Sequence, residues 1–275
     1  MEIDPILLEQ AADLIRQADG MLIGAGAGMG VDSGLPDFRG PEGFWRAYPA
    51  LREAGVAFTE IASPAAFDAN PLLAWGFYGH RLALYRRTVP HAGFALLRKW
   101  AAKMPLGARV FTSNVDGQFQ QAGFEPGHVV ECHGSIHQLQ CSVPCRQQTW
   151  SAADFAPDVD EASCRLRSAL PQCPHCGALA RPNIMMFGDW AWVDRGGTAA
   201  QHRLDQWLDR VERLVVLEIG AGTAIPSVRM MSHRAIVDHG AHLVRINLRE
   251  AQTPSGHVGL ATGALRALTA IEALL

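Results

Sequence analysis

Apolar residues along the chain follow two alternating patterns. Residues 3–18 place an apolar stripe at helical spacing, and Met21-Leu22-Ile23 is a short apolar run that stops at glycine, as a buried parallel strand does. Further apolar runs predict strands at residues 109–112, 129–131, 214–219 and 242–247. Helical patterns follow at residues 71–87 (after Asn70 as a cap), 92–103, 198–210, 226–239 and 259–274. Alternating strands and helices indicate a doubly wound, Rossmann-like α/β fold with a parallel sheet, whose ligands bind at the carboxyl ends of the strands.

Two close cysteine pairs interrupt this pattern. Cys141 and Cys145 form the first pair, and Cys173 and Cys176 form the second. Such pairs on short loops bring four thiolates to one tetrahedral Zn²⁺, and four thiolates leave no open position for a catalytic water, so the predicted zinc is structural. Two disulfides, or four unrelated buried thiols, are the alternatives. Disulfides are disfavoured because the chain begins with an acidic segment and no basic region followed by a long apolar run, which predicts a cytoplasmic protein.

The cysteine pairs also suggest how the chain is divided. Residues 140–181 are predicted to form a small inserted zinc-binding module, and residues 1–139 and 182–275 a discontinuous nucleotide-binding domain. Cys164 lies between the pairs and competes with them as a metal ligand, whereas Cys132 lies in an apolar run and is predicted to be a small buried residue.

Composition excludes two classes of partner. A net charge of −3 and a pI near 6.4 give no electrostatic footprint for nucleic acid. No apolar run approaches the roughly 18–20 residues that span a bilayer, so no membrane partner is expected. A chain of 275 residues that is 48% hydrophobic can bury one large core and a small additional one. A monomer is favoured over an oligomer.

Glycines follow the first predicted strand directly, from Gly24 to Gly30. Backbone without Cβ atoms can approach a pyrophosphate closely, and successive amide groups can cradle the anion. No register fits the G-x-G-x-x-G fingerprint, since the sixth position counted from Gly24 is Met29, and no P-loop lysine follows. An ordinary dehydrogenase and a P-loop nucleotidase are therefore disfavoured. A second glycine turn at Gly220-Ala-Gly222-Thr223 favours a shared nucleotide crevice over a merely flexible turn.

Residues 26–40, Gly-Ala-Gly-Met-Gly-Val-Asp-Ser-Gly-Leu-Pro-Asp-Phe-Arg-Gly, closely resemble the cofactor loop of the sirtuins, a family of NAD-dependent protein deacylases. Further motifs of the sirtuin pattern follow in the family's order: Thr112-Ser-Asn-Val-Asp-Gly117, His133-Gly-Ser135, the two cysteine pairs, Arg181-Pro-Asn-Ile-Met-Met-Phe-Gly188, Gly222-Thr223 and Ile246-Asn247. The resemblance covers nearly the whole chain, and several motifs in order make it specific.

The resemblance implies an enzyme that uses NAD to remove acyl groups from acylated lysine in protein substrates, releasing nicotinamide and O-acyl-ADP-ribose. It implies that His133 is the general base, a role that suits an imidazole of ordinary pKa near 6.5. Asn114 would contact the ribose and Asp116 the nicotinamide carboxamide. Phe187 and Gly188 would pair their backbone with an extended substrate peptide. The residues implied to bind NAD are Gly26, Ala27, Gly28, Asp37, Phe38, Arg39, Ser113, Asn114, Asp116, Gly222, Thr223 and Asn247.

The match departs from the family pattern in the loop after the second strand. Ser113 stands where most sirtuins have glutamine, and Phe119 where many have histidine. A branch of microbial sirtuins with an altered motif at this place acts as protein mono-ADP-ribosyltransferases, and this loop is similar to theirs. Retention of His133 argues for deacylation, because transfer of ADP-ribose to protein does not require that base. A non-catalytic NAD-sensing protein is a third interpretation.

Tyr78 and Arg81 lie three residues apart on one predicted helix, on neighbouring positions of one face. Sirtuins that remove succinyl or malonyl groups carry a similar Tyr-x-x-Arg, in which phenol and guanidinium hold the acyl carboxylate. The alternative is that Tyr78 belongs to an apolar core stripe and Arg81 to its charged flank.

Overall fold

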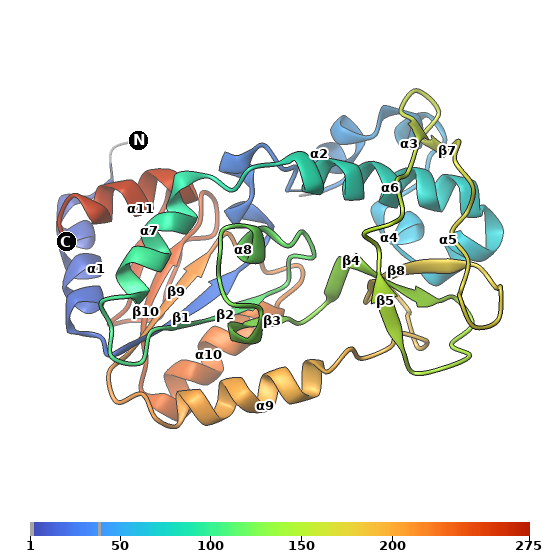
Figure 1. Ribbon diagram of the computed structural model, residues 1–275. Coiled ribbons are helices and arrows are strands. Elements are labelled where there is room, and N and C mark those ends of the chain that lie inside the picture. The colour runs from blue at the N-terminus through green and yellow to red at the C-terminus, as the bar shows by residue number, and fades with distance from the viewer. Residues whose placement is uncertain (1–2, 38–39) are drawn as a thin grey trace.

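The computed structural model describes residues 3–37 and 40–275 (Figure 1). Its larger part is built on a parallel sheet with the strand order β11-β10-β9-β1-β2-β3. The strands are β1 (Gly20–Ala25), β2 (Ala108–Thr112), β3 (Val129–Glu131), β9 (Leu214–Ile219), β10 (His242–Ile246) and β11 (Val258–Leu260). The chain runs outward from β1 in both directions, so the predicted doubly wound α/β fold is confirmed. The order changes direction between β1 and β9, which is where such sheets open a crevice at their carboxyl ends.

Helices cover both faces of this sheet because successive residues of a buried strand point to opposite sides. Ile23 of β1 packs with α1 (Pro5–Gln17), α7 (Ala92–Ala101) and α11 (Ala264–Glu272), whereas Leu22 packs with α9 (Gly197–Leu208) and α10 (Ser227–His239). Figure 1 shows the same arrangement, with α9 and α10 on one side of the strands and α1, α7 and α11 on the other. A short helix α8 (Gln118–Gln121) and 3₁₀ turns at Ala27–Met29, Val31–Ser33 and Pro126–His128 lie in the connections.

A second hydrophobic cluster forms the smaller part of the molecule, at the right of Figure 1. Its helices are α2 (Gly40–Ala47), α3 (Pro49–Glu53), α4 (Phe58–Ile61), α5 (Pro64–Ala69) and α6 (Pro71–Arg87). Its strands are β4 (Gly134–Cys141), β5 (Thr149–Ser151) and β8 (Ala180–Ile184) in one antiparallel sheet, and β6 (Val159–Asp160) and β7 (Arg165–Leu166) in a hairpin. The segment between the cysteine pairs therefore shares its core with helices from residues 40–87. The division of the chain into domains stays a prediction.

Helix α6 holds this second cluster together. Asn70 caps it as predicted, its side chain accepting a hydrogen bond from the backbone of Leu73 at 3.2 Å. The indole of Trp75 donates to the backbone oxygen of Ala180 at 2.9 Å. Gly76 lies against the backbone of Cys164, where an added Cβ would come within 2.0 Å of the carbonyl oxygen. Only glycine permits this approach of the helix to the β6–β7 hairpin.

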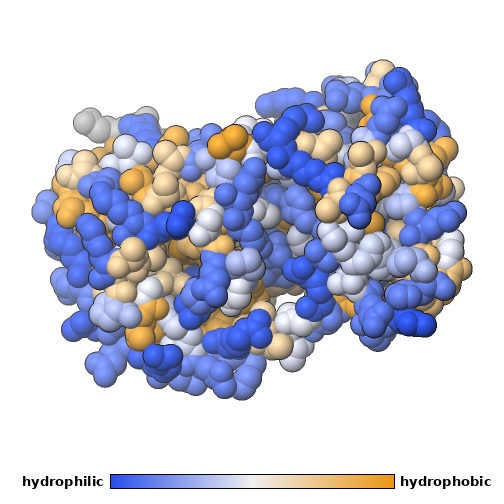
Figure 2. Space-filling model, viewed as in Figure 1, coloured by the Kyte–Doolittle hydropathy of each residue, from blue (hydrophilic) through white to orange (hydrophobic). Residues whose placement is uncertain are grey.

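One predicted element is wrong in its first part. The apolar residues from 259 onward indicated a helix through 274, but Val258 and Leu260 belong to strand β11, and α11 begins at Ala264. Val258 pairs with Val244 of β10, so tertiary strand pairing overrides the local helical spacing. Along the described ranges, no helix is long and apolar enough to cross a membrane. On the face shown in Figure 2 most residues are hydrophilic and the hydrophobic ones are scattered.

Candidate active site at the carboxyl ends of the strands

The two glycine turns lie against each other at the carboxyl ends of β1 and β9. The amide of Gly26 donates to Ile219 at 2.9 Å, and the amide of Gly28 donates to Gly220 at 3.1 Å. A Cβ on Gly26 would lie 2.7 Å from the Cα of Ala221, and one on Gly220, whose φ is +64°, would lie 2.4 Å from the carbonyl carbon of Gly28. Side chains at either position would push the turns apart. The sequence prediction of one shared crevice is consistent with this contact.

Backbone and side-chain hydrogen bonds tie the end of β2 to the first turn. The hydroxyl of Thr112 donates to Ala25 at 2.9 Å and accepts from the amide of Asn114 at 3.0 Å. The Asn114 side chain in turn donates to the carbonyl of Gly26 at 3.0 Å, and the amide of Ser113 donates to Ala25 at 3.1 Å. The loop that carries the variant Ser113 is therefore fixed beside the glycine turn by its backbone and by Asn114.

Asp116 is a buried carboxyl group in the same loop. It accepts a hydrogen bond from the amide of Gln118 at 2.9 Å, and its own carbonyl lies 2.9 Å from Nε2 of His137. Burial raises the pKa of Asp116 from 3.8 to about 6, although the Gln118 amide and the charge of Arg81 act in the opposite direction. The fold therefore places a carboxylate in an environment that disfavours its charge, which is a common property of functional sites.

His133 lies just beyond β3, with its Nε2 3.0 Å from the hydroxyl of Ser227 at the start of α10. Burial lowers the pKa of His133, and a hydrogen bond to the backbone of Ser113 only partly offsets that effect. The imidazole is consequently neutral near pH 7 and can accept a proton. The carbonyl of His133 accepts from the amide of Met185, which places the residue next to the loop that follows β8.

The loop after β8 is anchored by a buried ion pair between Arg181 and Asp189, whose side chains are 1% and 0% exposed and 2.7 Å apart. Asp189 also accepts from the amides of Met186 and Ala191, so it fixes both ends of the turn. Between them, Phe187 donates its amide to Ala62 and packs its ring against Phe58, yet remains 41% exposed. Gly188 has a φ of +66°. The sequence reasoning did not identify Asp189 as the anchor of this loop.

Tyr78 and Arg81 are both buried on α6. Tyr78 stacks on Phe67, with ring centroids 5.6 Å apart. The guanidinium of Arg81 donates to the hydroxyl of Tyr85 at 2.8 and 3.0 Å and lies over the rings of Phe77, Tyr78 and Tyr85. The side chain of Gln118 donates to the carbonyl of Thr88 at 3.1 Å, so the end of α6 lies close to the segment after β2. Carboxylate binding by Tyr78 and Arg81 stays a prediction.

The four predicted zinc ligands converge, with the sulfur atoms of Cys141, Cys145, Cys173 and Cys176 within 4.8 Å of one another. Two of the sulfur pairs, Cys141 with Cys176 and Cys145 with Cys173, are 3.7 Å apart. Tetrahedral zinc with bonds of about 2.3 Å places its sulfur ligands about 3.8 Å apart, so the cluster fits a structural Zn²⁺. Cys164, the competing candidate, lies instead in the second hydrophobic cluster.

Asn247, Gly222 and Thr223, which were predicted to bind NAD, follow strands β10 and β9. Asn247 is buried and donates to the carbonyl of Ala221 at 2.8 Å. The amide of Thr223 donates to the carboxylate of Glu250 at 2.9 Å, and an added Cβ on Gly222 would meet nothing closer than that carboxylate at 3.8 Å. Asp37 is half-buried at the end of the first described range. Phe38 and Arg39 lie outside the described residues.

Sequence reasoning missed Ser227, Arg229 and Glu250, which approach the predicted residues from α10 and from the loop after β10. Ser227 contacts His133, and Glu250 contacts Thr223. One signal in the sequence pointed to this region, namely charged residues inside apolar strands, Glu218 in β9 and Arg245 in β10. Buried charges need partners, so such residues mark a place where polar groups gather.

Known proteins resemble this chain along most of its length. Residues 26–217 match the Sir2 family. An NAD-dependent protein deacylase 2 of Pyrobaculum aerophilum is 31% identical over 248 residues, covering 90% of this chain and 87% of the relative. An NAD-dependent protein deacylase of Pyrococcus furiosus is 31% identical over 183 residues, 66% of each chain. The fold is also similar to the crystal structure of a Sir2 homologue–NAD complex, with a TM-score of 0.72, 23% identity, and 97% and 93% of the two chains covered.

Proposed function

The chain belongs to the Sir2 family, and on that premise we propose that it is an NAD-dependent protein-lysine deacylase. The observation that carries this function is the position of His133. Its imidazole is neutral because of burial, contacts Ser227, and adjoins both the Ser113–Asn114 loop and the loop after β8. A neutral base between a predicted cofactor crevice and a predicted peptide loop is what acyl transfer from lysine to a ribose requires.

The residues around the crevice fit NAD. The two glycine turns meet at the carboxyl ends of β1 and β9, where a pyrophosphate would lie, and a Cβ on Gly222 would meet nothing closer than the Glu250 carboxylate at 3.8 Å. When bound, NAD supplies the ribose that leaves nicotinamide and accepts the acyl group. Asn114 would orient that ribose, and Asp116 would accept a hydrogen bond from the carboxamide of nicotinamide. His133 would take up the proton of a ribose hydroxyl at Nε2, the nitrogen that faces Ser227.

The acylated lysine would enter as part of an extended peptide. The loop of Phe187 and Gly188 is held by the Arg181–Asp189 pair, and Phe187 is partly exposed. One solved Sir2 structure of similar fold contains a deacetylated p53 peptide together with 3′-O-acetyl-ADP-ribose, which supports a protein substrate for this chain. Backbone pairing reads little side-chain sequence, so we expect broad tolerance of the residues flanking the lysine.

The test is incubation of the protein with an acetylated peptide and NAD, followed by mass spectrometry of the products. We expect deacetylated peptide, nicotinamide and O-acetyl-ADP-ribose in equal amounts, and loss of all three in His133→Ala. His202→Ala is the matched control, since His202 is exposed on α9 and contacts Gln206. Deacetylated peptide without release of nicotinamide would contradict the proposal.

The alternative, protein mono-ADP-ribosylation, rested on Ser113 and Phe119. Phe119 is 2% exposed and packs against Phe94 and Phe124, with ring centroids 5.0 and 5.2 Å apart. Its difference from the common histidine is therefore explained by core packing. Ser113 alone supports the alternative, which predicts that label from NAD stays on protein and that His133→Ala retains this activity.

A further inference from the structure

His91 stands immediately before helix α7 and joins that helix to the loop after β1. Its Nε2 lies 2.9 Å from the carbonyl oxygen of Met29, and its Nδ1 lies 3.0 Å from the amide nitrogen of Gly93. Its own amide donates to the hydroxyl of Ser33 at 3.0 Å. Met29 and Ser33 are the last residues of the two 3₁₀ turns in this loop, so one residue contacts both turns.

The hydrogen-bond partners of the His91 imidazole determine which nitrogen carries the hydrogen. A carbonyl oxygen only accepts and a backbone amide only donates, so Nε2 donates to Met29 and Nδ1 accepts from Gly93. Burial lowers the pKa of His91, although the bond to Met29 and the charge of Asp32 act to raise it. The imidazole is therefore neutral near pH 7. One neutral ring caps α7 and also donates to the first glycine turn.

The residues around His91 hold its ring in this place. An added Cβ on Gly93 would lie 2.6 Å from Cε1 of His91 and 2.7 Å from Leu268 of α11. The ring of Phe94 packs against the imidazole, with centroids 4.9 Å apart. Met29, Phe94 and Leu268 all belong to the same hydrophobic core. Packing therefore fixes the imidazole, which is what a precise anchor for a loop requires.

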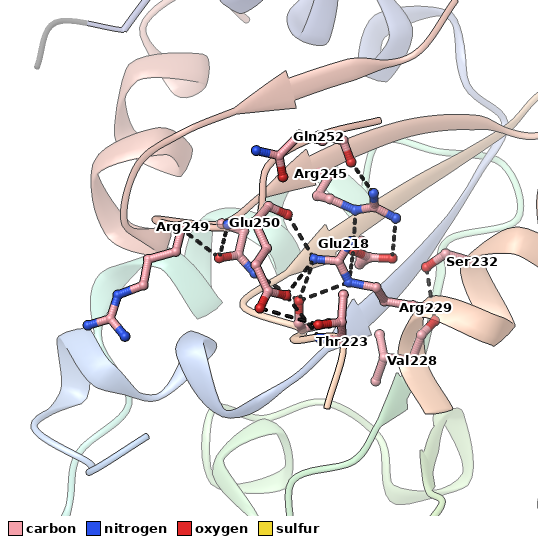
Figure 3. A network of polar contacts seen from close by, with 11 residues as sticks. Glu218, Thr223, Val228, Arg229, Ser232, Arg245, Arg249, Glu250 and Gln252 are labelled. Atoms are coloured by element: carbon pink, nitrogen blue, oxygen red, sulfur yellow. Dashed lines mark hydrogen bonds and ion pairs between the residues drawn. The ribbon is translucent and has the colours of Figure 1, made fainter. Parts of the chain in front are cut away.

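The two glycine turns of the crevice are held in different ways. Figure 3 shows charged side chains around the second turn, where Arg229 donates to the carbonyl of Ala221 and Glu250 accepts from the amide of Thr223. Residues 24–30 of the first turn contain four glycines and no polar side chain. Glycine loses more conformational freedom on ordering than any other residue, so the first turn depends on groups from other segments for its order.

We propose that His91 is a positioning residue of the crevice, which through Met29 holds the first glycine turn in the shape that receives the nucleotide. This inference rests on the proposed function. A loop that is already ordered in the free protein does not have to be ordered when the ligand binds, so the affinity for the ligand is higher. The second 3₁₀ turn has an anchor of its own, because Asp32 accepts from the amide of Leu265 at 2.8 Å.

Two substitutions separate the two roles of the imidazole. In His91→Asn, the side-chain oxygen takes the place of Nδ1 and still caps α7, but no donor reaches Met29. In His91→Gln, the amide nitrogen takes the place of Nε2 and reaches Met29, while the cap is lost. Calorimetry with ADP-ribose needs no turnover. It should show affinity about 3- to 10-fold weaker for His91→Asn, the net contribution of one neutral hydrogen bond, and within about twofold of the unaltered protein for His91→Gln.

Hydrogen exchange followed by mass spectrometry tests the anchor with no ligand present. Within the loop, the amides of Met29 and Gly30 donate to the carbonyls of Gly26 and Ala27. These amides should exchange about 3- to 10-fold faster in His91→Asn than in the unaltered protein. Asn70→Ala is the matched control, because it removes the cap of α6 and should change neither this exchange nor the affinity for ADP-ribose.

The outcomes separate the inference from the function beneath it. Equal losses of affinity in His91→Asn and His91→Gln, or no loss in either, would overturn the bond to Met29 as the anchor. Unchanged exchange of the loop in His91→Asn would overturn it as well, and each of these results would leave the deacylase intact. Absence of any ADP-ribose binding by the unaltered protein would overturn the proposed function and the inference with it.

Discussion

Replacing Asp116 by asparagine should make the protein more stable and less active. The carboxyl is 8% exposed, and burial raises its pKa from 3.8 to about 6. This difference in pKa between the folded and unfolded states means that ionised Asp116 destabilises the folded protein by about 3 kcal/mol. Asparagine has no charge to bury, and its side-chain oxygen can still accept from the amide of Gln118. The variant should therefore gain up to about 3 kcal/mol in unfolding free energy at neutral pH.

The stability gained by Asp116→Asn should depend on pH. Between pH 4 and 6 the folded protein retains a proton on Asp116 that the unfolded chain has released, so this group contributes stability that is lost as pH rises through about 6. The unfolding free energy of Asp116→Asn minus that of the unaltered protein should consequently increase across this range and level off above it.

Urea unfolding followed by tryptophan fluorescence at several pH values, with zinc present and NAD absent, measures this difference. Asp194→Asn is the control. Burial acts to raise the pKa of Asp194, but hydrogen bonds from Thr198 and Gly197 together outweigh burial and lower the pKa. The unfolding free energy of Asp194→Asn minus that of the unaltered protein should therefore not increase with pH. If the difference in unfolding free energy for Asp116→Asn stays flat or falls between pH 4.5 and 7.5, the assignment of a buried carboxylate with a raised pKa is refuted.

Three further outcomes are expected. His133→Ala should lower the rate of deacylation by 100-fold or more, about the contribution of a general base. Its affinity for ADP-ribose, measured by calorimetry, should stay within about threefold of that of the unaltered protein. Retained turnover would show that His133 is not the general base. Cys176→Ala should contain no stoichiometric zinc by elemental analysis, and its second hydrophobic cluster should become sensitive to proteolysis. An unaltered protein that is metal-free yet fully active and stable would contradict the zinc site. Arg81→Met should reduce kcat/KM on succinyl-lysine peptide selectively by about 10- to 100-fold if Arg81 binds an acyl carboxylate; equal losses on acetyl and succinyl peptides would assign Arg81 to the packing of α6.

Local patterns in the sequence were sufficient for the cysteine cluster and for five strands of the large sheet, β1, β2, β3, β9 and β10. Buried parallel strands such as β9 are near-continuous apolar runs, broken in β9 by Glu218, and a four-cysteine site needs only two short knuckles. Both are therefore visible without tertiary information. Strand β11 was not predicted, because Leu260 continues the helical spacing of Ala264 and Leu268 and becomes part of a strand only through pairing with β10.

Site residues could be predicted where they belong to a short sequence motif. They could not be predicted where their role depends on a contact with a distant segment of the chain. His133 and Asn114 were identified from the resemblance to a family. Ser227, Glu250 and the Arg181–Asp189 pair become visible only when the fold joins segments far apart in the chain. The raised pKa of Asp116 likewise comes from burial in the folded chain, which Arg81 of α6 only partly offsets, so it has no signature in the sequence.

The contact of Gly76 with Cys164 has a consequence for folding during synthesis, because the two residues lie far apart in the chain. Helix α6 emerges from the ribosome long before the segment that covers it, since Trp75 awaits a hydrogen-bond partner 105 residues later in the chain. Until that segment arrives, Trp75 lacks both its hydrogen-bond partner and its ring contact with Phe155. Zinc bound by Cys173 and Cys176 would hold the chain just before Ala180, so its supply during synthesis should affect how much of the nascent protein aggregates.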